Sequence, residues 1–240
     1  MLRIENLSYT AAGADGEKEI IRDLDLTLED KSFVVITGPN GGGKTTLAKL
    51  IMGLDKPTGG RILWQDEDVT SLSVTERAKR GISYGFQQPP RFKGMTVYDL
   101  LKIASGREMT RIECCDYLTR VGLCARDYVD RDMDDSLSGG EAKRIEIATI
   151  LARGSELMIF DEPEAGIDLW SFSKLTDTFG AIRQAREATL IVISHQERLI
   201  ALADEIVLID GGRVAARGTP EEIMPRIMGG TVSVCDRLEA

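Results

Sequence analysis

The residues from Gly38 to Thr46 have the types and spacing of a phosphate-binding loop. The sequence GPNGGGKTT fits the pattern G-x-x-x-x-G-K-[ST], and it lies between the apolar run FVVIT and the helical stretch TTLAKLIMGL. Glycines let successive backbone N–H groups converge on phosphate oxygens, and the N-terminus of the following helix adds a favourable dipole. We expect Lys44 to reach the β- and γ-phosphates and the Thr45 hydroxyl to bind Mg²⁺. The predicted nucleotide-binding residues are Gly38, Pro39, Asn40, Gly41, Gly42, Gly43, Lys44, Thr45 and Thr46.

Two adjacent carboxylates, Asp161 and Glu162, end the apolar segment LMIFDE. The carboxyl ends of parallel strands meet at one edge of a sheet, where nucleotides bind. Asp161 is therefore predicted to hold Mg²⁺, directly or through water, beside the phosphate loop. Glu162 is predicted to orient or deprotonate the water that attacks the γ-phosphate.

The segment LSGGE, which ends at Glu141, is a second candidate anion site. The Ser138 side chain and the N–H groups of Gly139 and Gly140 lie at the predicted start of the helix SGGEAKRIEIATILA. Because the chain already has one phosphate cradle, a second cradle suggests that two chains share each nucleotide.

The sequence resembles the ATP-binding-cassette (ABC) ATPases, whose signature LSGGE reproduces, over about residues 2–222. The resemblance implies an ATP hydrolase that uses ATP and Mg²⁺ and forms an ATP-dependent, head-to-tail homodimer. In that dimer Ser138, Gly139, Gly140 and Glu141 of one subunit would contact the ATP held by the phosphate loop of the other. Lys44 would be among the catalytic residues.

The resemblance also implies roles for residues outside these motifs. Gln87 matches the glutamine loop, as a catalytic residue and a contact of Mg²⁺, although the neighbouring Gln88 competes for this position. Asp168 ends AGID, which matches the D-loop, and His195 after LIVIS matches the switch histidine that contacts the γ-phosphate. Tyr9 matches the aromatic residue that stacks on adenine, and simple packing in a half-buried strand is the alternative.

The elements that must position these residues alternate between short β-branched runs and helical stretches, which is typical of an α/β protein. Four near-continuous apolar runs, at 33–37, 157–160, 190–194 and 205–209, are predicted to form a central, mainly parallel sheet. Alternating segments at 2–10 and 61–69 predict a small antiparallel β-subdomain.

From 96 to 131 the apolar spacing is helical without an intervening strand, which predicts a helical insert. We therefore expect a P-loop NTPase fold of the ABC type in a single domain, 1–240. Residues 1–95 and 137–240 would form the catalytic RecA-like core with its β-subdomain, and about 96–136 the helical subdomain.

Composition limits the partners and the location. Thirty basic against thirty-nine acidic residues give a net charge of −9, which has the wrong sign for nucleic acid. The start MLRIENLSY lacks the features of a signal peptide, and the apolar runs are shorter than the roughly 18 residues that span a bilayer, so we expect a cytoplasmic protein without membrane insertion. Cys114, Cys115, Cys124 and Cys235 lack C-x-x-C spacing and indicate neither a zinc site nor a disulfide scaffold, although Cys235 could contact a cluster.

The particular function depends on departures from the transporter pattern LSGGQ-x-QR and DEPTSALD. Here Glu141, Lys143, Arg144 and Glu164 depart from it, within LSGGEAKRIEI and DEPEAGID. These departures are similar to the SufC ATPases of SUF iron–sulfur cluster assembly, which implies a SufB- or SufD-like scaffold as the partner. The alternative is the ATP-binding subunit of an ABC transporter docked on a separate membrane permease. A nucleotide-gated module without turnover is disfavoured by the full set of catalytic residues.

Overall fold

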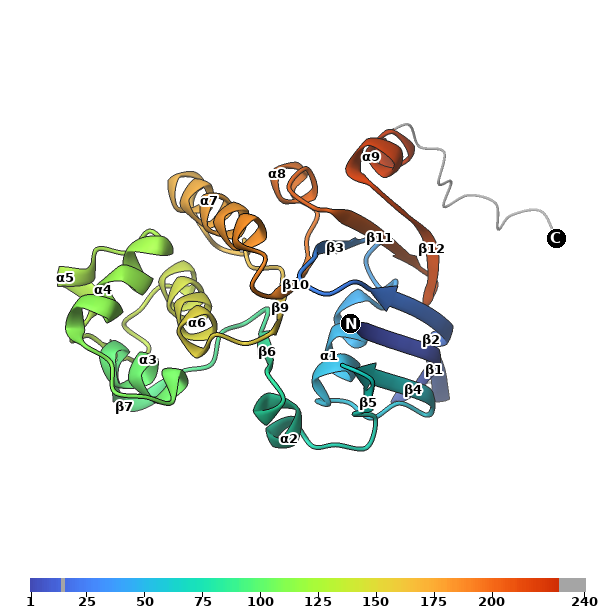
Figure 1. The fold of residues 1–240 in the computed structure, drawn as a ribbon, viewed down its shortest axis with the longest axis horizontal. Coiled ribbons are helices and arrows are strands. Elements are labelled where there is room, and N and C mark those ends of the chain that lie inside the picture. Colours follow the sequence, from blue (N-terminus) through green and yellow to red (C-terminus); the bar gives the residue numbers. More distant parts are fainter. Residues whose placement is uncertain (14–15, 229–240) are drawn as a thin grey trace.

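A six-stranded sheet forms the centre of the molecule in the computed structural model, which describes residues 1–13 and 16–228 (Figure 1). Its order is β12-β11-β3-β10-β9-β6, and all neighbours are parallel except the edge pair β11–β12. The inner strands β3, β9 and β10 are buried along their whole length and mostly apolar, as expected for strands that are covered on both faces. The strands are β3 (Phe33–Thr37), β6 (Ile82–Gly85), β9 (Leu157–Asp161), β10 (Thr189–Ile193), β11 (Glu205–Asp210) and β12 (Arg213–Gly218). The predicted central sheet is confirmed.

A second sheet is antiparallel and has four strands in the order β2-β1-β4-β5. It lies on the other side of α1 from the central sheet, and β2 contacts β12 (Figure 1). Its strands are β1 (Leu2–Gly13), β2 (Gly16–Leu28), β4 (Gly59–Trp64) and β5 (Glu67–Asp68). Helix α1 (Lys44–Met52) packs between the two sheets, and one apolar cluster joins all three elements. This is the predicted β-subdomain, with β2 as a long strand that was not foreseen.

The helical lobe occupies the opposite end of the molecule from the antiparallel sheet (Figure 1). It contains α3 (Val97–Ser105), α4 (Arg111–Arg120) and α5 (Ala125–Tyr128). Two short strands, β7 (Phe92–Thr96) and β8 (Asp132–Met133), pair at its borders. The stretch 96–131 is therefore mostly helical as predicted, and strands close the lobe where it joins the core.

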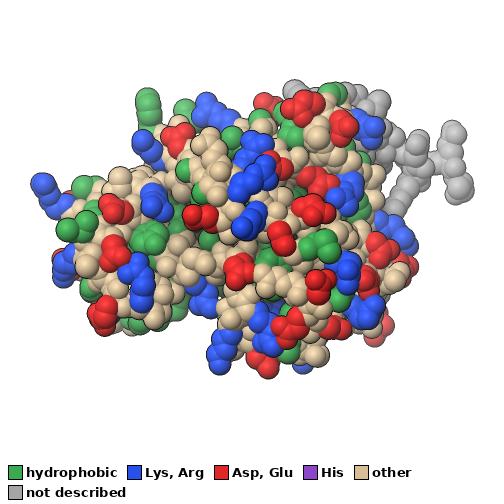
Figure 2. Space-filling view, viewed as in Figure 1, with side chains coloured by type: hydrophobic (Ala, Val, Ile, Leu, Met, Phe, Trp, Pro, Cys, Tyr) green, Lys and Arg blue, Asp and Glu red, His purple; other side chains and the backbone are tan. Residues whose placement is uncertain are grey.

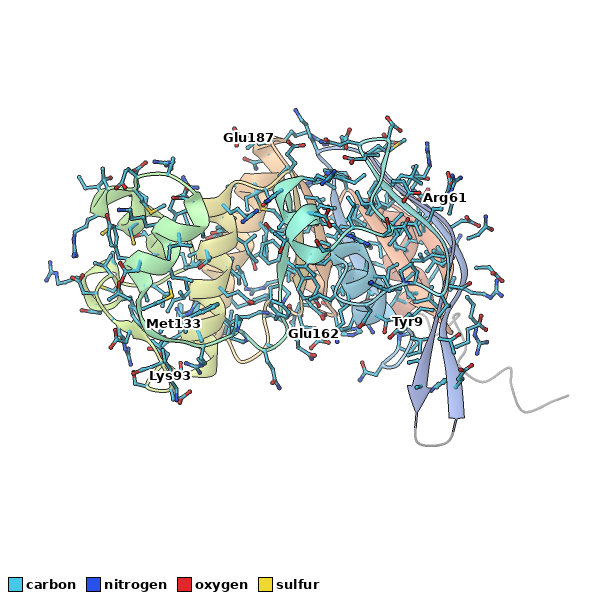
Figure 3. The ribbon with its side chains drawn as sticks, turned by 90° about the horizontal axis from the view of Figure 1, so that it is seen from below. Tyr9, Arg61, Lys93, Met133, Glu162 and Glu187 are labelled. Carbon is cyan, nitrogen blue, oxygen red and sulfur yellow. The ribbon has the colours of Figure 1, made fainter. Side chains whose placement is uncertain are left out.

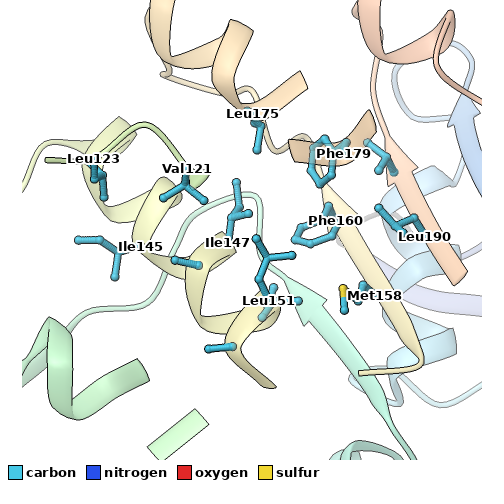
Figure 4. Close-up of a cluster of buried hydrophobic side chains, with 14 of the residues drawn as sticks. Val121, Leu123, Ile145, Ile147, Leu151, Met158, Phe160, Leu175, Phe179 and Leu190 are labelled. Carbon is cyan, nitrogen blue, oxygen red and sulfur yellow. The ribbon is translucent and has the colours of Figure 1, made fainter. Parts of the chain in front are cut away.

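Helix α6 (Gly139–Arg153) packs against both lobes, which explains its weak amphipathic pattern (Figure 4). Ile145 faces Val121 and Leu123 of the helical lobe, whereas Leu151 faces Phe160 of the central sheet (Figure 4). Helix α7 (Leu169–Ala185) contributes Leu175 and Phe179 to the same cluster. Helices α6 and α7 thus join the helical lobe to the strand that ends in Asp161 through one apolar cluster.

Helix α2 (Val74–Lys79) holds the C-terminus of α1 through Arg77, whose side chain is fully buried. Its guanidinium donates to the carbonyl oxygens of Leu50 and Ile51 at 2.6 and 2.7 Å, and to those of Thr70 and Leu72 at 2.8 and 3.2 Å. The bonds to Leu50 and Ile51 satisfy carbonyls at the end of α1, and the other two hold the segment that precedes α2.

Helices α8 (Glu197–Ile200) and α9 (Pro220–Met228) complete the described fold. None of the helices within the described residues has the length and apolarity needed to cross a membrane. Acidic and basic side chains alternate over the face shown in Figure 2, which is consistent with a modest excess of acidic residues in the whole chain. Cys114 is buried, and burial raises the pKa of its thiol to about 11. Cys235, proposed as a possible cluster contact, lies outside the described residues.

Candidate nucleotide site

The phosphate loop connects the end of β3 to the start of α1, as the sequence predicts. Gly38 has φ +137°, and a Cβ there would lie 2.0 Å from the carbonyl oxygen of Ile209, so any other residue would collide with β11. The Lys44 ammonium donates to the carbonyl oxygens of Gly38 and Pro39 at 2.7 and 2.9 Å. The lysine side chain therefore folds back over its own loop.

Asp161 is fully buried at the end of β9 and accepts two hydrogen bonds. The Thr45 hydroxyl donates to Oδ1 at 3.2 Å, and the Tyr84 hydroxyl donates to Oδ2 at 2.9 Å. Burial raises the pKa of the Asp161 carboxyl, and the two hydrogen bonds oppose that effect. The structure thus brings the predicted magnesium residues of two distant motifs into direct contact.

Glu162 adopts φ +46°, which is uncommon for a residue with a side chain and often marks functional sites. Its N–H donates to the carbonyl oxygen of Ile193 at 3.0 Å, so the backbone is held between two strand ends. The Gln87 side-chain amide donates to Glu162 Oε2 at 2.8 Å. Gln87, and not the neighbouring Gln88, makes this contact.

His195 follows β10, and its Nδ1 lies 3.4 Å from the Thr37 hydroxyl at the end of β3. Partial burial and the charge of Lys44 lower the pKa of the imidazole, and the charge of Glu162 opposes them. The charges of Lys44 in the phosphate loop and of Glu162 therefore both act on the His195 imidazole.

A cavity of about 680 Å³ joins these elements. The predicted residues that line it are Asn40, Gly41, Gly43, Lys44, Thr45, Thr46, Gln87 and Glu162. Residues that the sequence analysis missed complete the lining: Lys18, Glu19, Ile20 and Arg22 of β2, and Gly211. Three of the four residues from β2 are charged, and no sequence motif marked them as part of the site.

Tyr9 is half-buried and packs against the core of the β-subdomain, and it is not among the residues that line the cavity. It pairs with Ile21 across the β1–β2 ladder. Figure 3 shows Tyr9 on the β1–β2 side of α1 and Glu162 on the side toward the helical lobe. Tyr9 is thus half-buried by packing against the β-subdomain, and its stacking on adenine stays a prediction.

The signature residues lie at the N-terminus of α6, outside the cavity lining. Ser138 caps the helix by accepting from the Glu141 N–H at 3.3 Å, and Glu141 Oε2 accepts from the Ser138 N–H at 2.6 Å. Glu141 Oε1 accepts from the Tyr128 hydroxyl, and that bond lowers the pKa of Glu141 to about 2. The chain's own phosphate loop is therefore not completed by its own signature.

Asp168 is the N-cap of α7 and accepts from the backbone N–H groups of Trp170 and Ser171, each at 3.0 Å. The D-loop before it contacts the signature closely, since a Cβ on Gly140 would lie 2.4 Å from the carbonyl oxygen of Gly166. The sequence motifs around Asp168 and Ser138 therefore share one surface.

Lys143 connects the signature helix to the catalytic elements. In the sequence it stands out only because it departs from the transporter pattern. Its buried ammonium donates to the carbonyl oxygen of Phe86 and, at 3.2 Å, to that of Asp161. Glu146, 3.4 Å from the same ammonium, accepts from the Phe86 N–H at 2.9 Å. The N–H and the carbonyl oxygen of Phe86, the residue before Gln87, are thus both bonded to side chains of α6.

Comparison with known proteins assigns the family. Residues 21–165 match the family model described as "ABC transporter", and the chain belongs to this family. It is 38% identical to the uncharacterised ABC transporter ATP-binding protein MJ0035 of Methanocaldococcus jannaschii, over 93% of this chain and 90% of that protein. It is 31% identical to the lipopolysaccharide export system ATP-binding protein LptB of Haemophilus influenzae, over 93% of this chain and 92% of that protein.

A solved dimeric structure of the ATP-binding cassette MJ0796, bound to ADP and Pi, has the same fold, with a TM-score of 0.83 and 22% identity. The match covers 92% of this chain and 99% of that one. The chain is an ABC-type ATPase with the predicted P-loop NTPase fold, antiparallel β-subdomain and helical subdomain. The named relatives are transporter ATP-binding proteins, so the similarity to the SufC ATPases stays a proposal.

Proposed function

We propose that this ABC ATPase is the ATP-binding subunit of a transporter, which docks on a separate membrane permease from the cytoplasmic side. The proposed mechanism of ATP hydrolysis is inferred from the cavity that Lys44, Gln87 and Glu162 line together. The relatives named above support the transporter assignment, because the LptB name identifies a subunit of an export system.

In the proposed reaction, Lys44 exchanges its carbonyl partners for the β- and γ-phosphates. Glu162 orients or deprotonates a water molecule held by Gln87, and the water attacks the γ-phosphorus as the bond to the leaving ADP oxygen breaks. His195 stabilises the charge on the transferred phosphoryl group. These steps need the side chains that already converge at one edge of the sheet.

The residues fit Mg²⁺, which prefers oxygen ligands and takes one or two carboxylates together with phosphate oxygens. The Thr45 hydroxyl and the Asp161 carboxylate lie in contact, and Gln87 supplies a further amide oxygen. When bound there, the ion would neutralise phosphate charge during transfer.

The proposed dimer accounts for the separation of the signature from the phosphate loop within one chain. Ser138, Gly139, Gly140 and Glu141 of one copy would close on the nucleotide of the other, with Asp168 at the same surface. The capped N-terminus of α6 provides backbone N–H groups and a favourable dipole for that second contact.

Transmission to a partner is supported by the backbone before Gln87. Because Lys143 and Glu146 fix both polar groups of Phe86 to α6, a change around Gln87 moves with the helical lobe. Phe86 and Phe92 on either side of this segment are each 38% exposed and offer apolar contacts beside the lobe. A permease segment that docks there would sense closure of the nucleotide site.

A second candidate function is iron–sulfur cluster assembly with a SufB- or SufD-like scaffold. Its support is the sequence SGGE-x-KR, whose Glu141 and Lys143 make specific contacts in this structure, with Tyr128 and Phe86 respectively. Both functions use the same ATP chemistry and differ in the partner alone.

Affinity purification of the Glu162→Gln protein with Mg-ATP, from its own cells after membranes are solubilised, tests the choice. The variant should retain ATP and hold its partner longest, and mass spectrometry identifies the captured chain. A protein with several membrane spans supports the transporter proposal, whereas a SufB- or SufD-like protein replaces it. Glu162→Gln combined with Lys44→Ala is the control, since it should lose ATP and release the partner.

A further inference from the structure

The loop after β9 and the loop after β10 are bonded to each other behind the nucleotide site. The first loop carries Glu162 and leads to Asp168, and the second carries His195. Their side-chain connection is a hydrogen bond from the Ser194 hydroxyl to Glu164 Oε1 at 2.5 Å. Neither Glu164 nor Ser194 lines the nucleotide cavity.

Ser194 makes a second hydrogen bond beside this one. Ser194 is fully buried, and its oxygen accepts from the Gln196 N–H at 3.0 Å. A serine hydroxyl has one proton to donate, and here that proton goes to Glu164. The backbone on both sides of His195 is therefore tied, through one hydroxyl, to a carboxyl group on the other loop.

Glu164 also organises its own loop. Its carbonyl oxygen accepts from the Ile167 N–H at 3.1 Å, one residue before Asp168. Its side-chain Oε2 is buried and has no hydrogen-bond partner within residues 1–13 and 16–228. An unsatisfied buried carboxyl oxygen costs stability, so a residue needed for stability alone would be better served by a smaller, neutral side chain.

We propose that Glu164 is a positioning residue for His195. By fixing Ser194, it would hold the imidazole at the correct position relative to the Glu162 carboxylate. The inference rests on the proposed function, because it requires that His195 contact the γ-phosphate. Glu164 itself touches no reacting atom, and it acts through its hydrogen bond with Ser194, which joins two loops that follow neighbouring strands.

Four variants test the proposal through ATP turnover: Glu164→Ala, Glu164→Gln, Ser194→Ala and the Glu164→Ala/Ser194→Ala double variant. Glu164→Ala and Ser194→Ala should each lower kcat about tenfold, because small misplacements of a catalytic group are costly. KM for ATP should stay within about twofold, since the phosphate loop is untouched. Glu164→Gln keeps an acceptor at the same place and should stay within about threefold of the wild-type kcat. The double variant should be no slower than the slower single variant, because both remove one interaction.

NMR of the imidazole provides a second readout, since the chain has a single histidine. Glu164→Ala should shift or broaden the His195 signals, whereas Glu164→Gln should leave them near those of the wild type. Any of three results would overturn the proposal. The first is a wild-type kcat in Glu164→Ala, and the second is a double variant whose loss equals the product of the two single losses. The third is a Glu164→Gln protein that is as slow as Glu164→Ala. If Glu164→Ala does not fold, Ser194→Ala and Glu164→Gln decide with the same criteria.

His195→Ala separates this inference from the function on which it rests. If His195→Ala hydrolyses ATP at the wild-type rate, the role assigned to His195 is wrong. If His195→Ala is slow and Glu164→Ala is as fast as the wild type, the catalytic assignment stands and the positioning role of Glu164 is wrong.

Discussion

Glu162 combines a strained backbone with a side chain that already holds Gln87. Glu162→Gln should retain ATP and hydrolyse it at least roughly a hundredfold more slowly, in the range expected for the loss of a general base. Its amide oxygen can still accept from Gln87, so the loop geometry should persist. Single-turnover and steady-state assays measure the rate, and turnover equal to that of the wild type would remove Glu162 from the mechanism.

The pKa of His195 is predicted to lie below its ordinary value of 6.5 in the nucleotide-free protein. Lys44→Ala removes a neighbouring positive charge and should raise this pKa, whereas Glu162→Gln removes a negative charge and should lower it. Because protonation is disfavoured in the folded state, His195 contributes stability above pH 6.5 that is lost as the pH falls through the lowered pKa. An NMR titration of the single histidine in untagged protein measures all three values, and a wild-type pKa at or above 6.5 would contradict the assignment.

The phosphate-binding residues could be predicted because a local pattern defines them: a strand, a glycine loop and a helix in immediate succession. The contact of Asp161 with Thr45 also followed from where β9 ends, whereas the bond between Gln87 and Glu162 was not predicted. Tyr9 could not be placed in this way, because bulges shift the β1–β2 register on both sides of it. A shift by one residue turns a side chain to the other face of a sheet.

Within the central sheet, the longer apolar strands were predictable, whereas β6 and β12 were not. The strands β3, β9, β10 and β11 are apolar except at their ends, so their sequence alone is informative. Strand β2 has an exposed, charged first part and a bulge at Asp23, and β12 alternates at the edge of the sheet. The four residues of β6 are too few to show a period. As a result, the cavity wall that β2 contributes was missed.

Arg77 fastens helix α2 to the end of α1, and its removal should destabilise the whole β-subdomain. Arg77→Ala leaves buried carbonyl oxygens without donors and opens a cavity, so we expect a loss of about 3 kcal/mol in the free energy of unfolding. Arg80→Ala on the same helix is the matched control, because Arg80 forms a solvent-exposed pair with Glu67. Urea denaturation should show a much smaller change for Arg80→Ala; equal losses would mean that the buried bonds do not set the difference.

The first turn of α6 offers a second matched pair. A Cβ on Gly140 would lie 2.4 Å from the carbonyl oxygen of Gly166, whereas a Cβ on Gly139 meets nothing within 4 Å. Gly140→Ala should therefore lower the free energy of unfolding by about 1–3 kcal/mol as the D-loop is displaced. Gly139→Ala should leave it unchanged or slightly raised, because alanine favours a helix. Thermal or urea melts without nucleotide make the comparison, and similar losses in both variants would show that the contact between α6 and the D-loop is loose.

For the molecule as a whole, the prediction concerns assembly. Glu162→Gln should double its molar mass when Mg-ATP is added, and the Lys44→Ala/Glu162→Gln protein should not, as measured by light scattering. Trp170 is 84% exposed and follows Asp168, whereas Trp64 is 2% exposed. In a Trp64→Phe background, the emission of Trp170 should move to shorter wavelength as the dimer forms. A dimer that forms without this change would place the D-loop outside the interface.

The bonds from Lys44 to the carbonyl oxygens of Gly38 and Pro39 have a consequence for nucleotide exchange. Without phosphate, the ammonium is not left to water, because the loop supplies substitute oxygens from its own backbone. ATP must compete with these internal acceptors, which lowers the net affinity while sparing the cost of folding the loop anew. When ADP and phosphate leave, the Lys44 ammonium can form its bonds to the same two carbonyl oxygens again. The same two bonds thus compete with ATP and with its products alike, while they hold the loop in one conformation.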